Sequence, residues 1–253
     1  MSGLVLALGL FQTAPGTALP DLPEAYPFGV GETFAYSGKM GFFNVGGATI
    51  SIPAIDTLRG VPSFVFRFEV NGGLPIYRLN SVMESRTGMA DFRSRQFIQD
   101  SDENGRDRYR RYEIYPDSGF FLAQDDTTHW PTPAQPLDDA AFLYFVRTLP
   151  LQAGKTYALD YYFKQERNPL TIKVEKRERC ELPGKVQTEC FVIHPVIGDK
   201  GIFGPRANAR VWITTDARRI PVQIRSTTVG TVTLRLERMS LVPPTPRPRP
   251  GAP

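Results

Sequence analysis

Alternation of apolar and polar side chains is the feature of this sequence that most restricts its fold. The stretch SFVFRFEV shows it clearly, because Phe64, Phe66 and Phe68 fall on one side of an extended backbone. Arg67 and Glu69 fall on the other side. A period of two is typical of a β-strand with one buried face and one face in water. The same period recurs over most of the chain, so the sequence predicts a protein built from strands.

Turn signals separate about eleven or twelve such segments at meander-like spacing. The Asn-Gly pair at 104–105 marks the tip of a hairpin, and Pro116 to Gly119 mark the next turn. Near the amino end, Phe34, Tyr36, Met40 and Phe42 are expected on one strand face. We therefore expect a mainly all-β fold: a strongly curved antiparallel meander sheet, a sandwich or a half-open barrel.

One segment breaks the alternation and predicts a short buried helix over 139–149. Asp138 or Asp139 can cap its amino end, and Pro150 ends it. Residues 140–146 carry no charge. A helix of about ten residues is not stable alone in water, and one that is apolar on most sides must be covered. We expect the concave face of the curved sheet to cover it.

Arg147 lies at the carboxyl end of this helix, where it suits the helix dipole. If its side chain is drawn inward, it needs a carboxylate partner, because an unpaired buried charge is very costly. Glu32 and Asp216 are the expected partners in such a buried ion pair. The alternative is that Arg147 reaches solvent.

The amino end resembles an export signal. Residues 4–11 form an apolar run too short to span a bilayer, and Gly16 and Ala18 form a small-x-small site. We expect a signal peptide over 1–18, and hence a periplasmic or otherwise exported protein. No later segment is apolar enough for a membrane helix, so no transmembrane segment is expected after signal cleavage.

The rest of the chain divides simply. An approach segment over 19–26 is followed by a single β domain over 27–242. Residues 243–253 are rich in proline and are expected to form a disordered tail.

Cys180 and Cys190 are the two cysteines of the chain, and they flank a turn at Pro183-Gly184. Strands folding back there would set the cysteines opposite each other. We expect a disulfide, which agrees with an oxidising compartment. Two buried free thiols are the alternative.

The sequence contains few of the motifs and residues that catalytic sites use. The segment LPLQAGKT lacks the first glycine of a phosphate-binding loop, the chain has two histidines, and it has no G-x-S-x-G motif. We expect no cofactor and no metal site. A hydrolase with carboxylates from distant strands stays open as a less favoured reading. The net charge of +4 is mixed with acids along the chain, so no nucleic-acid partner is expected.

Seven arginines between 86 and 111 form the densest basic region, with acids interspersed. Ion pairs across a wet sheet face explain them. A site for anionic head groups or surface polysaccharide is the alternative.

Three stretches resemble a known family. They are FGVGETFAYSGKMGFFNVGGATISI, DDAAFLYFVRTLPLQAGKTY, and WITTDARRIPVQI followed by GTVTLRLE. In this order they resemble the bacterial exported family catalogued as domain of unknown function 3108, over about residues 27 to 240. The positions that match the motifs are Glu32, Tyr36, Gly46, Tyr144, Arg147, Trp212, Asp216, Pro221 and Gly230. The resemblance implies export and a β architecture, and it implies no established activity.

By analogy of fold alone, a curved sheet with a helical lid is similar to the lipoprotein carriers of the bacterial envelope. The favoured hypothesis is therefore a non-enzymatic envelope protein that holds an apolar or amphiphilic ligand, such as a lipid or acyl chain, between sheet and helix. The expected ligand-binding residues are Tyr36, Phe142, Tyr144, Phe145 and Trp212. The alternative is a structural or assembly module that binds an envelope protein or a polysaccharide.

Overall fold

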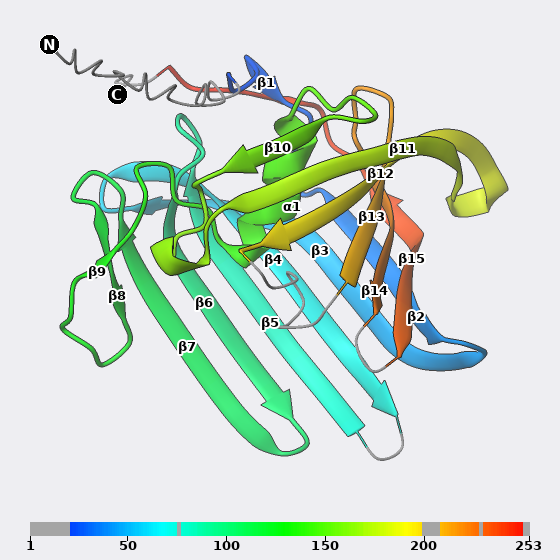
Figure 1. The fold of residues 1–253 in the computed structure, drawn as a ribbon, viewed down its shortest axis with the longest axis horizontal. Coiled ribbons are helices and arrows are strands. Elements are labelled where there is room, and N and C mark those ends of the chain that lie inside the picture. Colours follow the sequence, from blue (N-terminus) through cyan, green and yellow to red (C-terminus); the bar gives the residue numbers. More distant parts are fainter. Residues whose placement is uncertain (1–20, 75–76, 199–207, 228–229, 250–253) are drawn as a thin grey trace, which may run out of the picture.

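The computed structural model describes residues 21–74, 77–198, 208–227 and 230–249. The expected signal peptide over 1–18 lies outside these residues. One large antiparallel sheet curves around a single helix, α1 (Asp139–Thr148), as Figure 1 shows. Mainly-β architecture with one short helix is thus confirmed.

The strands are numbered in chain order. The first nine are β1 (Ala25–Tyr26), β2 (Thr33–Met40), β3 (Phe43–Leu58), β4 (Val61–Leu74), β5 (Tyr77–Gly88), β6 (Ser94–Glu103), β7 (Arg106–Tyr115), β8 (Phe120–Ala123) and β9 (Trp130–Pro131). The others are β10 (Thr156–Leu159), β11 (Leu170–Leu182), β12 (Val186–Ile197), β13 (Asn208–Thr214), β14 (Pro221–Thr227), β15 (Thr231–Ser240) and β16 (Thr245–Pro246). Short 3₁₀ turns lie at η1 (Gln165–Arg167) and η2 (Pro183–Lys185).

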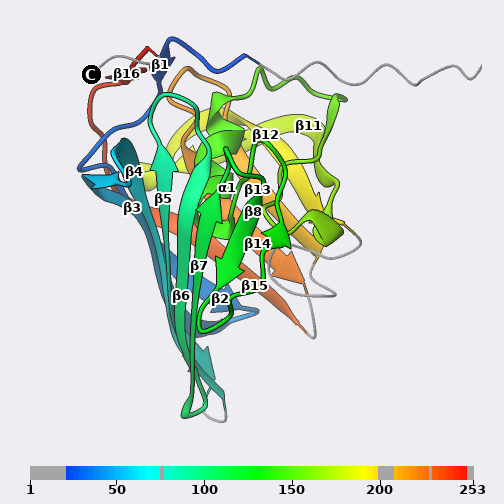
Figure 2. The same cartoon turned by 90° about the vertical axis from the view of Figure 1, so that its left-hand side faces the viewer.

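Fourteen of these strands form one sheet in the order β10-β11-β12-β13-β14-β15-β2-β3-β4-β5-β6-β7-β8-β9. Neighbours in the chain are mostly neighbours in the sheet, as a meander requires, and β15 pairs with β2 to join the two ends of the chain. Within the described strands, no pairing joins β9 to β10, so the sheet is strongly curved and open. Figure 2 shows its two walls, with α1 between them and β4–β7 extending well beyond the helix.

The buried face of β4 follows the predicted period. Phe64 and Phe66 are fully buried, and Phe68 is 9% exposed. The other face was expected to be mostly in water, but Ser63 and Val65 on it are also buried, so that part of the prediction was wrong. The expectation for Phe42 was wrong, because its side chain is fully exposed. Strand β2 ends at Met40, and Gly41 then adopts a positive φ of 59° that starts the turn. Phe42 therefore lies at a hairpin tip and not on a strand face.

The proline-rich segment differs from the disordered tail that the sequence predicts, at least over its first seven residues. Strand β16 pairs with β1, and the Thr245 N–H donates to the Phe28 carbonyl at 3.2 Å. The Arg247 N–H donates to the Glu24 carbonyl at 2.8 Å. The reason is that prolines occupy alternate positions here, so the remaining N–H groups all lie on one edge of the extended chain. Residues 250–253 lie outside the described part.

The disulfide between Cys180 and Cys190 is present, with a Cα–Cα distance of 5.9 Å. It crosses β11 and β12 diagonally, because Cys180 pairs in register with Thr188 and Cys190 pairs with Glu178. The expectation that the cysteines face each other directly was wrong. The turn is centred on Gly184, one residue before the midpoint of the two cysteines.

Replacing both cysteines by serine should lower the free energy of unfolding by about 3 kcal/mol, because the crosslink closes a short loop in the unfolded chain. Urea unfolding followed by far-ultraviolet circular dichroism measures this loss. The wild-type protein with its disulfide reduced should show a similar loss. A serine variant as stable as the oxidised wild type would contradict this prediction.

Candidate functional site

The carboxyl-terminal half of α1 is packed in a solid aromatic core. Tyr144 stacks on Phe66, with ring centres 4.2 Å apart, and Phe28 contacts its edge at 5.1 Å. Phe145 lies 5.6 Å from the Tyr161 ring. Aromatic pairs at these distances fill the space between helix and sheet. Tyr144 and Phe145, expected to bind a ligand, therefore lie within the protein core.

A buried ion pair anchors the end of the helix. Arg147 donates from both terminal nitrogens to the Glu32 carboxylate, at 2.5 and 2.9 Å. The Arg147 and Glu32 side chains are 1% and 0% exposed. Asp216, the other expected partner, instead accepts hydrogen bonds from Thr214 and from the Arg218 N–H, both at 2.9 Å. The bidentate geometry allows Glu32 to neutralise Arg147 without help from solvent.

Tyr36 and Trp212 lie apart from each other. The Tyr36 hydroxyl donates to the Pro221 carbonyl at 2.7 Å, and burial raises the pKa of this phenol far above its usual range. Trp212 lies on the opposite, outer face of the sheet, where its indole N–H donates to Glu178. The structure thus does not unite the five expected ligand-binding residues in one site.

A small apolar cavity adjoins the amino-terminal half of α1. Its volume is about 40 Å³. It is lined by Ile50, Phe68, Met83, Asp139, Ala140, Phe142, Leu143, Val211 and Ile224. A water molecule occupies about 30 Å³ in the liquid, so this cavity as it stands has no room for an acyl chain. Of the five expected residues, Phe142 is the one that lines it.

The concave face of the sheet continues beyond this cavity, and its side chains change from apolar to charged with distance from α1. Met83 and Leu143 are only partly buried, as are Val70 and Leu234 farther from the helix. These side chains form an apolar strip on both walls of the sheet. We call this strip, together with the cavity beside Phe142, the concave cleft.

The strand register shows which side chains lie beyond the apolar strip on the wall of β4–β7. Phe68 pairs with Met83, and the next strands continue the row with Gln99 and Arg110. Paired residues share one face of an antiparallel sheet. The next row ends at Arg108 on the same face. The concave face therefore runs from apolar side chains near α1 to arginines on β7.

The arginines of the predicted basic region fall on two faces. Arg111 lies on the outer face and pairs with Glu113 of its own strand at 2.6 Å, whereas a cross-strand ion pair of the kind that the sequence predicts is formed by Arg86 with Asp56 at 2.8 Å. Arg106, Arg108 and Arg110 share the concave face, and no ion pair involves them within the described residues. Arg106 and Arg108 line a hollow of about 340 Å³ with Ser101, Glu103 and Asn104. The segment RDRYRR alternates between the two faces of the strand. This period of two could have shown from sequence that Arg106, Arg108 and Arg110 share one face and Arg111 lies on the other.

Two further observations bear on function. Within the described residues, no three histidine, cysteine or carboxylate side chains gather as a metal site would require. No helix in the described part of the chain has the length and hydropathy needed to cross a bilayer.

Comparison with known proteins places the chain among proteins without an assigned activity. A family model described as "Protein of unknown function (DUF3108)" matches residues 35–237. No curated protein matches the chain. A crystal structure titled as a beta-barrel-like protein of domain of unknown function DUF1849, from Brucella abortus, superposes with a TM-score of 0.57. That match covers 85% of this chain and 99% of the other at 9% identity, so the likeness concerns the fold alone.

Proposed function

The chain belongs to the DUF3108 family of proteins of unknown function, and we propose that it is an exported, non-enzymatic protein that binds an amphiphilic ligand with an anionic head group. The ligand's apolar part lies in the concave cleft. Its head group lies at the arginines of β7. The observation that carries the proposal is the change along one sheet face from partly buried apolar side chains to arginines that form no ion pair within the described residues.

The apolar part of the ligand rests on the strip rather than inside the core. Val70, Met83, Leu143 and Leu234 are apolar side chains that keep contact with solvent on a concave surface. Covering such surface stabilises a complex by about 25 cal/mol per Å² removed from water. Ligand sites are commonly concave and apolar with few polar groups, which is the character of this face.

The arginines lie at a suitable reach for the head group. From Phe68 on β4 to Arg110 on β7 the path crosses three strand spacings, about 14 Å in total. Arg110 donates to Gln99 at 3.1 Å, which holds it over the concave face. Arginine recognises carboxylate and phosphate oxygens through paired donors. An anionic amphiphile can therefore contact the strip and the arginines together.

Export to an oxidising compartment is part of the proposal. It is supported by the disulfide, since such bonds persist mainly in oxidising compartments. The apolar leader expected over 1–18 supports it from the sequence.

Titration with the fluorescent amphiphile dansyl-undecanoic acid tests the site. The double variant Met83→Gln/Leu143→Gln should bind about tenfold more weakly, because it replaces apolar contacts worth about 1–2 kcal/mol together. The matched control is Val82→Gln/Val186→Gln. Val82 alternates with Met83 and so lies on the outer face, and Val186 is 56% exposed.

The control variant should bind the probe as the wild type does. Arg108→Gln/Arg110→Gln should weaken binding of the fatty acid but not of the corresponding dansyl alcohol. The proposal fails if no saturable binding occurs, or if the control loses as much affinity as the cleft variant.

A further inference from the structure

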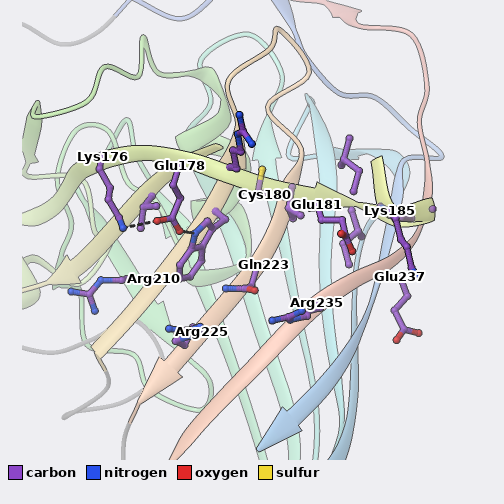
Figure 3. A pocket seen from close by; sticks show the side chains of 18 of the residues that line it. Lys176, Glu178, Cys180, Glu181, Lys185, Arg210, Gln223, Arg225, Arg235 and Glu237 are labelled. Atoms are coloured by element: carbon purple, nitrogen blue, oxygen red, sulfur yellow. Dashed lines mark hydrogen bonds and ion pairs between the residues drawn. The ribbon is translucent and has the colours of Figure 1, made fainter. Parts of the chain in front are cut away.

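A second, larger hollow lies on the outer face of the sheet, away from the concave cleft. The hairpin of β11 and β12, with η2 at its tip, crosses over β14 and β15, as Figure 3 shows. The space between this hairpin and the strands beneath it is a groove of about 980 Å³. We call it the outer groove. Its walls come from β11, β12, β13, β14, β15 and η2.

The disulfide gives the outer groove a fixed roof. Cys180 on β11 lines the groove. Its bond to Cys190 joins β11 to β12 just before the tip of the hairpin. A hairpin held in this way cannot separate its two strands locally, so the roof of the groove is itself rigid. Preorganised sites lose less entropy on binding.

Four acids line the outer groove, and two of them, Glu175 and Glu178, are neutralised by ion pairs. Glu175 accepts from Arg210 at 2.8 and 3.1 Å. Glu178 accepts from Lys176 at 2.5 Å and from the Trp212 indole. These hydrogen bonds from Lys176 and Trp212 hold the pKa of Glu178 below its usual value, so it stays ionised and is neutralised by its own partners.

Four other cations line the groove, and no ion pair in the described part of the chain neutralises them. Arg225 lies over the Trp212 ring, 5.3 Å from its centre, and Arg235 lies on the neighbouring strand. Lys185 lies on the roof in Figure 3, and Arg179 of β11 also lines the groove. Within the described residues, none of these four side chains forms an ion pair. Glu181 and Glu237, the other two acids of the groove, also form no ion pair within the described residues, so four cations stand against two acids and the groove keeps an excess of positive charge.

The basic surface extends beyond the groove. Arg225 and Arg235 also line an adjoining hollow of about 470 Å³, together with Lys39, Gly41, Thr231 and Thr233. None of these six lining residues is acidic. Thr233 pairs in register with Arg225 on one side and with Lys39 on the other, so the three lie side by side on one face. Arg225 and Lys39 are two strand spacings apart, about 10 Å.

We propose that the outer groove and its adjoining hollow bind an anionic polysaccharide. Cations on three neighbouring strands, Arg225, Arg235 and Lys39, fit a ligand with repeated negative groups. The hydroxyls of Thr231 and Thr233 and the amide of Gln223 fit its hydroxyl groups. A concave, roofed groove excludes the flat surface of a bilayer. Trp212 is 7% exposed beneath Arg225, so its ring is not free to anchor a peptide.

Calorimetric titration with a heparin octasaccharide tests this site on the full-length protein. The variant Arg225→Gln/Arg235→Gln should bind at least tenfold more weakly than the wild type. The matched control is Arg108→Gln/Arg110→Gln, which removes the same charge from the concave face. It should bind heparin within about twofold of the wild type, and both affinities should fall as salt is raised.

Three outcomes would overturn the proposal. One is an equal loss in the two variants, which would mean that net charge alone attracts the polymer. Another is unchanged binding in Arg225→Gln/Arg235→Gln. The third is equal affinity for a single-stranded oligonucleotide of the same charge, which would mean that the groove does not select a polysaccharide. The amphiphile test uses the opposite face, so either proposal can fail while the other stands.

Discussion

Replacing Glu32 by glutamine should lower the free energy of unfolding by about 3–5 kcal/mol. The substitution keeps the shape of the side chain and removes its charge, which leaves the Arg147 guanidinium buried without a counter-ion. The other neighbours of the guanidinium carry no charge: the rings of Phe28 and Phe34 lie 5.1 and 5.2 Å away, and the Arg218 carbonyl accepts a hydrogen bond from Nη2 at 3.2 Å. Urea unfolding followed by the fluorescence of Trp130 and Trp212 measures the loss.

A double variant separates loss of the ion pair from loss of packing. Glu32→Leu/Arg147→Met replaces both charges by apolar side chains and should be less destabilised than Glu32→Gln, by about 2 kcal/mol or more. The Nε of Arg147 already lacks a hydrogen-bond partner within the described residues. Replacing Arg147 by methionine therefore loses no hydrogen bond at that atom. If the double variant is as unstable as the single one, the destabilisation does not come from an uncompensated charge, and our account of this pair is wrong.

Asp138 should give the protein a stability that falls as pH rises. Burial raises the pKa of this carboxyl to about 7, although it caps α1 by accepting from the Ala140 and Ala141 N–H groups. In the unfolded chain an aspartate titrates near pH 4, so between about pH 4 and 7 the folded state holds a proton that the unfolded state has released. The contribution is therefore full below about pH 4 and is lost by about pH 7, a change of about 4 kcal/mol.

The variant Asp138→Asn isolates this effect, because asparagine also caps helices and does not titrate. Asp139, whose pKa burial also raises, is present in both proteins and contributes to both. Relative to the variant, the wild type should lose about 3–4 kcal/mol between pH 4 and pH 8. A difference that stays constant, or that changes in favour of the wild type as pH rises, would contradict the prediction.

The strands and the helix could be predicted because their signals are local. Phe64 and Phe66 alternate with more polar positions over one strand, and the apolar run after Asp138 breaks that alternation. The need of Arg147 for a carboxylate also follows from one residue and the cost of burying it. Which carboxylate it binds is not local, because Glu32 lies 115 residues away and Asp216 was equally plausible from sequence.

The candidate site was predicted less well, because sequence does not distinguish a packed aromatic side chain from one that lines a cavity. Tyr144 and Phe145 are aromatic like Phe142, yet they lie in the solid part of the core. Trp212 alternates with the buried Val211 and Ile213, and that period could have placed it on the outer face. The outer groove could not be predicted from the sequence, because it forms where the hairpin of β11 and β12 crosses strands that are distant in the chain.

Selective labelling of methionine methyl groups with carbon-13 tests the concave cleft most directly. A spin-labelled stearic acid broadens the signals of methyl groups that lie near it. We predict that it broadens the Met83 signal, because Met83 lines the cavity beside Phe142. The signal of Met89, which is 7% exposed, does not line the cavity and accepts a hydrogen bond from Tyr26 at its main-chain carbonyl, should stay sharp. Equal broadening of both signals, or an unchanged Met83 signal at saturating ligand, would contradict the proposed amphiphile site.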